Sequence, residues 1–205
     1  MKIIEPSVQI IGTINGENML KNIELAARNC YKSEDKIKDG SAARLITACI
    51  KRGHESILEH EKISVRIICD RGVMAELTRH RTGVAFSIES TRYCRYDGGD
   101  MLFIRPCFWK EGSAEMSAWE IAMSKAEEEY NRLIELGAKP EEARDVLPLS
   151  LKTEIFMTAN LREWRHIFKL RSAKAAHPQI RQVMNKLLSL FKEQVPVIFD
   201  DINNE

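Results

Sequence analysis

The sequence has few cysteines and no long apolar run, and each absence excludes a class of protein. Its five cysteines are odd in number, widely spaced and form no Cys-x-x-Cys pair. We therefore expect neither a disulfide framework nor a structural zinc site. No apolar run approaches the roughly 20 residues that span a bilayer, and the N-terminus has no apolar stretch typical of a signal peptide. These absences predict a reduced, cytoplasmic protein without a membrane segment.

The chain also lacks an excess of charge of either sign. Its 205 residues include 31 Lys and Arg against 30 Asp and Glu, which gives a formal net charge of +1. Without a global basic field, bulk electrostatics does not draw the protein to nucleic acid. A nucleic-acid-binding helical protein is therefore the least favoured of the functions considered, and we expect no nucleic-acid partner.

Hydrophobic periodicity predicts a single α+β domain over residues 1–205. Apolar residues recur at helical spacing in residues 18–28, 41–53, 71–81, 113–136, 140–148, 161–170 and from 178 onward. They alternate, or form short β-prone runs, in residues 8–13, 61–70, 102–104 and 151–159. Ser41 and Asn160 are the predicted N-caps of the helices that follow them. We see no internal repeat or linker.

Lysine is absent between Lys62 and Lys110, although arginine is frequent there. The stretch 79–93, RHRTGVAFSIESTRY, has arginines at both ends and a glycine-containing middle. The planar guanidinium group binds phosphate and carboxylate in a bidentate manner, which lysine cannot do. We interpret this stretch as an anion site, while surface arginines in structural salt bridges are the alternative.

Two further groups of polar residues are candidates for a site. Residues 53–60, GHESILEH, hold two His and two Glu, but the spacing is not His-Glu-x-x-His and no Cys or Asp completes a metal set. We expect no metal there and favour an organic ligand over capping and surface roles. The second group comprises Arg144, Asn160, Arg162, His166 and Arg171, for which a solvated helix face is an equal alternative.

Catalytic nucleophile motifs are missing. There is no G-x-S-x-G, Walker or G-x-G-x-x-G pattern, so hydride or one-carbon chemistry requires a bound cofactor. The residues alone indicate an anion-binding α+β enzyme or binding protein.

At these motifs the chain resembles the flavin-dependent thymidylate synthases. The family signature is Arg-His-Arg, seven residues and then Ser, usually continuing as Ser-x-Arg-Tyr; here residues 79–81 and 90–93 supply its two ends. Residues 53–60 resemble the family's Gly-His-x-Ser/Thr-x-x-Glu-His box. The residues Ala143-Arg144, Leu147-Pro148, Asn160-x-Arg162, His166 and Leu170-Arg171 follow in the family's order and spacing.

The resemblance, which spans roughly residues 20–200, implies a fold, an assembly and a reaction. The fold is a central, mostly antiparallel sheet flanked by helices, and the assembly is a homotetramer with FAD sites between subunits. Reduced nicotinamide (NADPH) reduces the flavin and methylenetetrahydrofolate supplies the one-carbon unit. The flavin then delivers hydride to complete the methyl group on dUMP, a small-molecule nucleotide substrate, with no attack by an enzyme cysteine.

By motif match, the resemblance also implies residue roles. FAD contacts fall to Ser56, Glu59, Arg79, His80, Arg81, Asn160, Arg162 and His166. Nucleotide contacts fall to Glu76, Arg79, Ser90, Arg92, Arg144 and Arg171. The catalytic group comprises Arg171, which stabilises charge beside the pyrimidine carbonyl, together with His54 and Arg81.

Three departures from the family pattern concern the substrate. The gap between Arg81 and Ser90 is eight residues instead of seven; Glu76 stands where members often have Gln; and Ile88 stands where many have Glu or Gln. A carboxylate near a phosphate opposes binding unless arginine neutralises it. The departures motivate an alternative function, in which the same fold and flavin modify another pyrimidine nucleotide.

Overall fold

The structure, a computed structural model, describes residues 1–98 and 101–203, and the chain falls into two compact units. The first unit comprises Met1–Val8, Ile67–Arg79 and Phe86–Phe156, and the second comprises Gln9–Arg66, His80–Ala85 and Met157–Glu205. Each unit therefore combines segments that are distant in sequence. The predicted single domain over residues 1–205 stays a prediction.

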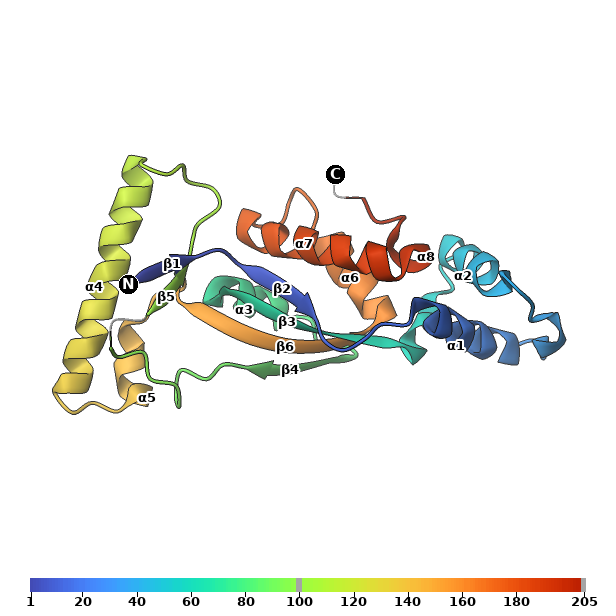
Figure 1. Cartoon of the computed structure of the whole chain (residues 1–205), viewed down its shortest axis with the longest axis horizontal. Helices are drawn as coiled ribbons and strands as arrows, with labels where there is room; N and C mark the ends of the chain where they lie inside the picture. Colours follow the sequence, from blue (N-terminus) through green and yellow to red (C-terminus); the bar gives the residue numbers. More distant parts are fainter. Residues whose placement is uncertain (99–100, 204–205) are drawn as a thin grey trace. The chain divides into compact units, whose positions relative to one another are not determined.

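A four-stranded sheet has the order β2-β3-β6-β4 (Figure 1). Its strands are β2 (Ser7–Ile10), β3 (Lys62–Asp70), β6 (Lys152–Asn160) and β4 (Val84–Ile88). In the first unit the Glu89 amide donates to the Glu154 carbonyl, and in the second the Asn160 amide donates to the Gly83 carbonyl. The paired residue numbers fall along the β4 side, from 89 to 83, while they rise along the β6 side, from 154 to 160. β4 and β6 are therefore antiparallel. The α+β class and the antiparallel sheet are confirmed.

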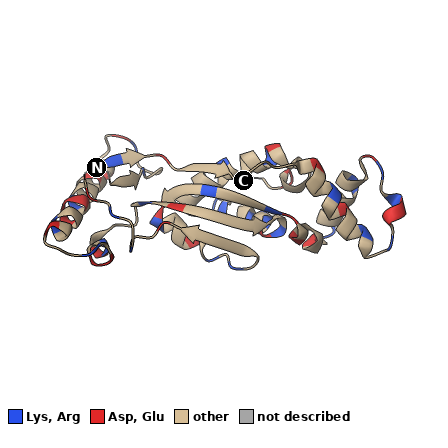
Figure 2. Cartoon of the chain, turned by 60° about the horizontal axis from the view of Figure 1, so that its bottom comes forward, with Lys and Arg blue, Asp and Glu red and all other residues tan. Residues whose placement is uncertain are grey.

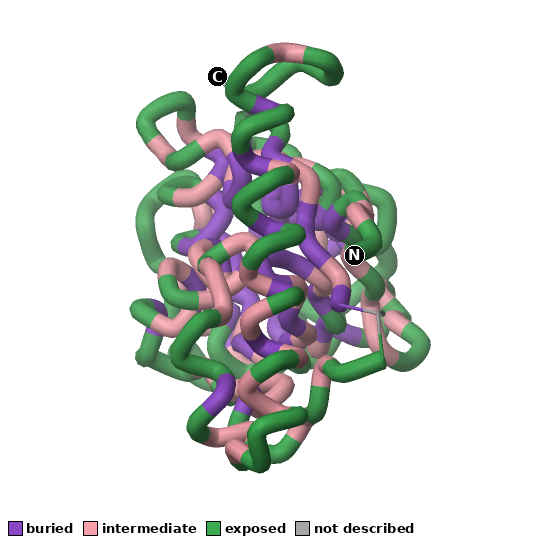
Figure 3. Tube along the Cα trace, turned by 90° about the vertical axis from the view of Figure 1, so that its left-hand side faces the viewer, coloured by how far each residue is buried: buried purple, intermediate pink, exposed green. Residues whose placement is uncertain are grey.

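The strands β3 and β6 bury one face, as their alternating sequences predict. In β3 the buried residues are Ile63, Val65, Ile67 and Cys69 together with the terminal Asp70, and in β6 they are Thr153, Ile155, Met157 and Ala159. This period of two places every second side chain in the core. Figure 3 colours the described residues by whether they are buried, intermediate or exposed.

In the first unit, an apolar cluster forms around the long helix α4 (Ala114–Glu135). It contains Met101, Phe103, Met116, Trp119, Met123, Tyr130, Ala143 and Leu151. β1 (Lys2–Ile4) and β5 (Leu102–Ile104) pair in parallel, and the unit also contains α3 (Arg71–Leu77), α5 (Pro140–Ala143) and the 3-10 turn η3 (Arg144–Val146). β5, α4 and α5 were predicted, whereas β1 was not.

The second unit is mainly helical. It contains α1 (Gly16–Asn29), η1 (Glu34–Lys36), α2 (Ser41–Lys51), η2 (Glu55–His60), α6 (Leu161–Arg171), α7 (Pro178–Gln194) and α8 (Pro196–Phe199). Its core includes the aromatic rings of Trp164, Phe168, Phe191 and Phe199, whose centroids lie 5.1–5.8 Å apart in the contacting pairs. Trp164 donates its Nε1–H to the carbonyl of Ile63 at 3.0 Å, which satisfies the polar end of a buried ring.

Two local predictions were wrong. α3 ends at Leu77, so Arg79-His80-Arg81 follow the helix and do not form its last turn. The chain must reverse there to enter β4, a strand that was not predicted. α2 is capped by Gly40, because the Ser41 hydroxyl is engaged by the preceding loop, where it accepts from the Lys38 amide at 3.0 Å.

The surface charges of the two signs are interspersed along the chain (Figure 2), in keeping with a net charge of +1. Among the described residues, no helix is both long enough and apolar enough to cross a bilayer.

Candidate functional site

The junction between β6 and α6 organises the candidate site in the second unit. β6 ends at Asn160, and α6 begins at the next residue. The Asn160 side chain accepts a hydrogen bond from the Glu163 amide at 2.8 Å, so the predicted N-cap is confirmed. This cap holds the first turn of α6, from which Arg162 and Glu163 project, and His166 follows in the second turn.

A cleft of about 550 Å³ lies at this junction. It is lined by Glu55, Glu59, Thr82, Gly83, Asn160, Arg162, Glu163, His166 and Lys169. Four of these, Glu59, Asn160, Arg162 and His166, were predicted to bind the cofactor. Segments about 100 residues apart meet here, since Arg162 donates to Glu59 at 2.5 Å with a sequence separation of 103.

Gly83 is required where the chain passes Asn160. Its φ is +66°, and a Cβ added there would collide with the Asn160 side-chain amide. Only glycine adopts this conformation without strain and also leaves room for the amide. The turn before β4 therefore presents bare backbone to the cleft.

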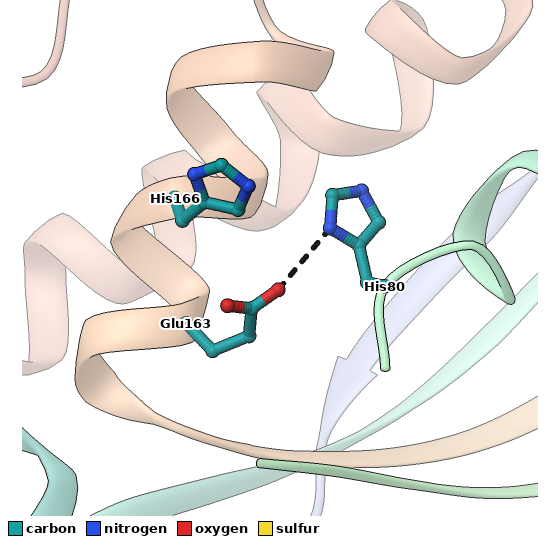
Figure 4. A group of neighbouring side chains, drawn as sticks. All are labelled: His80, Glu163 and His166. Atoms are coloured by element: carbon teal, nitrogen blue, oxygen red, sulfur yellow. Dashed lines mark hydrogen bonds and ion pairs between the residues drawn. The ribbon is translucent and has the colours of Figure 1, made fainter. Parts of the chain in front are cut away.

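His80, Glu163 and Arg171 form a hydrogen-bonded chain beside the cleft. The Nδ1 atom of His80 lies 3.2 Å from a Glu163 carboxylate oxygen (Figure 4), and Arg171 donates its Nε–H to the Nε2 atom of His80 at 3.1 Å. A guanidinium group can only donate, so Nε2 must be the accepting nitrogen. Neutral His80 therefore carries its proton on Nδ1 and donates it to Glu163.

Burial explains the ionisation of this group. His80 is only 6% exposed, and desolvation, followed by the charges of Arg171 and His166, lowers the pKa of His80 to about 4. Burial raises the pKa of the Glu163 carboxyl. Both effects favour the neutral imidazole.

His80, Glu163 and His166 also have the composition of a metal site. Within the described residues, one ligand atom from each lies within 4.8 Å of the others, and the His80 and His166 rings meet edge to face. A metal on Nδ1 of His80 would displace the proton that donation from Arg171 places there. The hydrogen-bonded arrangement accounts for the geometry without a metal.

Arg165 anchors η2, the segment that carries Ser56 and Glu59. Its side chain is 1% exposed and donates to Glu55 at 3.3 Å and to Asp201 at 2.6 Å. It also donates to the Ile198 carbonyl in α8. Burial lowers the pKa of Arg165, but its two carboxylate partners raise it by more. Arg165 and Glu163 were missed because charged residues on a helix are usually solvated; the signal was that Trp164-Arg165 and Ile167-Phe168 share the helix's buried side.

The other predicted cofactor and catalytic residues do not line the cleft. His54 and Ser56 are exposed, as are Arg79 and Arg81. Arg171 lies at the end of α6 and donates to His80, which lies beside the cleft.

The remaining predicted nucleotide-binding residues lie in the first unit. Arg92 donates to Glu141 at 2.7 Å, and its amide donates to the Ser90 hydroxyl at 3.2 Å. Arg92 lowers the pKa of the Glu141 carboxyl. Arg144 is exposed at the start of η3, and Glu76 is half-buried in α3.

Glu89, beside Ser90, is held from two sides. It accepts a hydrogen bond from the Tyr96 hydroxyl at 2.8 Å and pairs with Lys152 at 2.6 Å. Burial and this hydrogen bond raise the pKa of Tyr96. Glu89 is therefore held by two partners, whereas Arg92 is exposed.

The fold is of the α+β class, and the cleft in its second unit combines three carboxylates with the cationic side chains of Arg162 and Lys169. The family profile described as "Thymidylate synthase complementing protein" matches residues 13–197. A flavin-dependent thymidylate synthase from Geobacter sulfurreducens is 33% identical over 186 residues, covering 87% of this chain and 80% of the relative. One from Pyrococcus horikoshii is 35% identical over 170 residues, covering 80% and 70% respectively.

The chain belongs to the flavin-dependent thymidylate synthase family. A solved structure, a UMP/dUMP methylase PolB from Streptomyces cacaoi bound with 5-Br dUMP, superposes with a TM-score of 0.81. It is 26% identical, and the match covers 98% of this chain and 96% of that one. The family resemblance seen in the motifs is confirmed.

Proposed function

We propose that this protein methylates dUMP to dTMP, with FAD as cofactor and with methylenetetrahydrofolate and NADPH as co-substrates. The observation that carries the proposal is the cleft of the second unit. It brings together Glu59, Asn160, Arg162 and His166, four motif residues from two distant segments of the chain. Three of them lie on the β6–α6 segment, and Glu59 comes from η2, about 100 residues earlier.

The donors of the cleft suit a flavin dinucleotide. Arg162 and Lys169 offer positive charge to a pyrophosphate, and the carboxylates of Glu55 and Glu59 can accept hydrogen bonds from hydroxyl groups. The bare backbone at Gly83 allows close approach. When bound, FAD would carry hydride between the reduced nicotinamide and the one-carbon unit.

The nucleotide phosphate is assigned to Ser90, Arg92 and Arg144 in the first unit. The Arg92 amide already donates to the Ser90 hydroxyl, and the exposed Arg92 guanidinium pairs with Glu141. Exposed ion pairs are weak, so a phosphate dianion can take the place of Glu141. The Arg79 and Glu76 side chains are the other residues that we assign to nucleotide binding.

Arg171 is assigned to the pyrimidine ring. A positive group beside a ring carbonyl stabilises the negative charge that develops as the ring carbon attacks the one-carbon unit. His54 is assigned to the part of the site where flavin and folate meet. Arg81 is assigned to the stabilisation of charge near the flavin.

We further infer a cytoplasmic homotetramer with active sites shared between subunits. The support is that Arg79, Arg81, His54 and Ser56 are exposed and lie outside the cleft of their own chain, where a second copy can complete their contacts. Sedimentation analysis should give four times the 23.5 kDa chain mass.

The function is tested by turnover and by one variant. The purified protein should show flavin absorbance and form dTMP from dUMP, while UMP and dCMP serve as competing substrates. Arg171→Ala should keep its flavin and lose about 100- to 1000-fold in turnover, the usual cost of removing a charge-stabilising group. Flavin-bound wild-type protein that converts UMP or dCMP but not dUMP would overturn the choice of substrate. Loss of flavin from Arg171→Ala would show that this arginine serves the flavin and that its assignment to the nucleotide is wrong.

A further inference from the structure

The hydrogen bonds around His80 all run in one direction. Arg171 donates to His80, and His80 donates to Glu163. The direction is fixed because the guanidinium Nε has no lone pair to offer, so only one neutral tautomer of His80 satisfies both neighbours. The other tautomer would point two N–H groups at each other and leave Glu163 without a donor from the ring.

We propose that Glu163 is a positioning residue that orients the Arg171 guanidinium through His80. This inference rests on the proposed role of Arg171 at the nucleotide. The Glu163 carboxylate holds the proton of His80 on Nδ1. The Nε2 atom is then unprotonated, and its lone pair accepts the hydrogen bond from the Nε–H of Arg171. Because Nε lies in the guanidinium plane, this hydrogen bond also sets the plane of the two terminal nitrogens.

The local structure supports a positioning role. Glu163 is held by the first turn of α6, where Asn160 caps its amide at 2.8 Å. The side chains of His80 and Glu163 are 5% and 13% exposed, so water does not compete effectively for these hydrogen bonds. Arg171 lies two turns further along the same helix. One rigid helix therefore carries both ends of the hydrogen-bonded chain, and His80 bridges them.

A charged imidazolium cannot fill the same role. A proton on Nε2 would face the donor of Arg171, and burial together with the charges of Arg171 and His166 opposes it. The arrangement works only with neutral His80, and a carboxylate that accepts from Nδ1 selects the tautomer that it needs.

The direct test is the tautomer of His80 in the FAD-loaded protein. Histidine labelled with ¹⁵N, observed by two-bond ¹H–¹⁵N correlation at pH 7, distinguishes the protonated nitrogen, and His80→Gln identifies the signal. Wild-type protein should show protonated Nδ1 and unprotonated Nε2. A proton on Nε2 would overturn the proposal whatever the activity.

Two substitutions of Glu163 separate positioning from packing. In Glu163→Leu the acceptor is lost, the tautomer should shift toward Nε2–H, and dUMP affinity measured by calorimetry should fall about 10- to 100-fold, since an unsatisfied polar group is left. Glu163→Gln keeps an acceptor for Nδ1–H, so it should recover most of that affinity and the wild-type tautomer. Because Glu163 also lines the cleft assigned to FAD, the FAD content of both variants is measured, and dUMP affinity is compared at equal flavin occupancy.

Glu193→Leu serves as the matched control, because Glu193 is an exposed glutamate of α7 in the same unit. Its tautomer signal and dUMP affinity should equal those of wild type. The proposal is overturned if Glu163→Leu keeps its dUMP affinity, or if it loses FAD, since Glu163 would then act on the cofactor directly. Wild-type protein that binds FAD but not dUMP would refute the proposed function, and the tautomer result would still distinguish that failure from a wrong hydrogen-bond direction.

Discussion

Two arginines assigned to the nucleotide are held in opposite ways in the two units. In the second unit, Arg171 is held through the buried pair of His80 and Glu163, whose side chains are 5% and 13% exposed. In the first, Arg92 is held by Glu141 directly, with exposed fractions of 57% and 37%. Both arrangements contact a guanidinium group, but the first is much less exposed to water than the second.

The difference follows from the physics of each environment. A buried network keeps its geometry because every broken hydrogen bond leaves a polar group unsatisfied. An exposed ion pair contributes little and exchanges readily with solvent or with another anion. The second unit therefore suits a group that must be preorganised, and the first suits a group that must release one partner to take up a phosphate.

The strongest way to test this contrast is to remove a buried and an exposed arginine. Arg165→Leu should lower the free energy of unfolding by roughly 3 kcal/mol, because Glu55 and the Ile198 carbonyl lose a buried donor. The control is Arg95→Leu, which breaks an exposed pair with Asp97 in the first unit. Urea denaturation should show a lowered midpoint only for Arg165→Leu; equal effects would mean that burial does not separate the two kinds of pair.

A second test uses pH. His80 has a pKa near 4 in the fold against an ordinary value of 6.5, so the unfolded chain binds more protons between these values. Stability should therefore be complete above pH 6.5 and fall as the pH drops toward 4, by at most about 3 kcal/mol. Glu163, whose pKa is raised, contributes a slope of opposite sign as the pH rises above its ordinary value.

His80→Gln should therefore flatten the decline in unfolding free energy between pH 6.5 and 4, as measured by urea titration at several pH values. An unchanged slope in this variant would show that His80 is not held neutral by its surroundings.

The smallest of the expected changes in stability concerns the turn before β4. Gly83→Ala should cost about 1–2 kcal/mol, because a side chain at φ +66° is strained and would meet the Asn160 amide. It should also weaken FAD binding, since Asn160 caps α6 and lines the cleft. Gly98→Ala in the first unit is the control: its φ is also positive, but a Cβ there meets nothing within 4 Å. Equal loss of flavin in both variants would contradict the role of the Gly83–Asn160 contact.

The sequence predicted the elements that carry strong periodicity and missed those that depend on distant partners. β3, α4 and α6 were predicted because burial of one face imposes a period on their residues. β1 and β4 were missed, since each is short and acquires its hydrogen bonds from a strand far along the chain. The Arg79–Arg81 segment was placed in a helix because its local composition allows one, whereas pairing of the next residues with β6 ends the helix at Leu77.

The candidate site was predictable only in part for the same reason. The family motifs indicated Glu59, Asn160, Arg162 and His166, which line the cleft. The motifs could not indicate that Glu163 is the partner of His80, 83 residues away, because sequence spacing carries no information on such a contact. Arg165 was missed because a buried arginine is recognised only once its carboxylate partners are known.

We assign FAD to the second unit and the nucleotide phosphate to the first. The most direct test is the flavin content of two variants, read from the visible absorbance of the purified proteins. Arg162→Leu alters the cleft of the second unit. Arg92→Leu alters a residue of the first unit that we assign to the nucleotide phosphate. We predict that Arg162→Leu loses most of its flavin while Arg92→Leu retains a full complement and binds dUMP more weakly. Full flavin in Arg162→Leu together with loss of flavin in Arg92→Leu would contradict the assignment of the cleft to the cofactor.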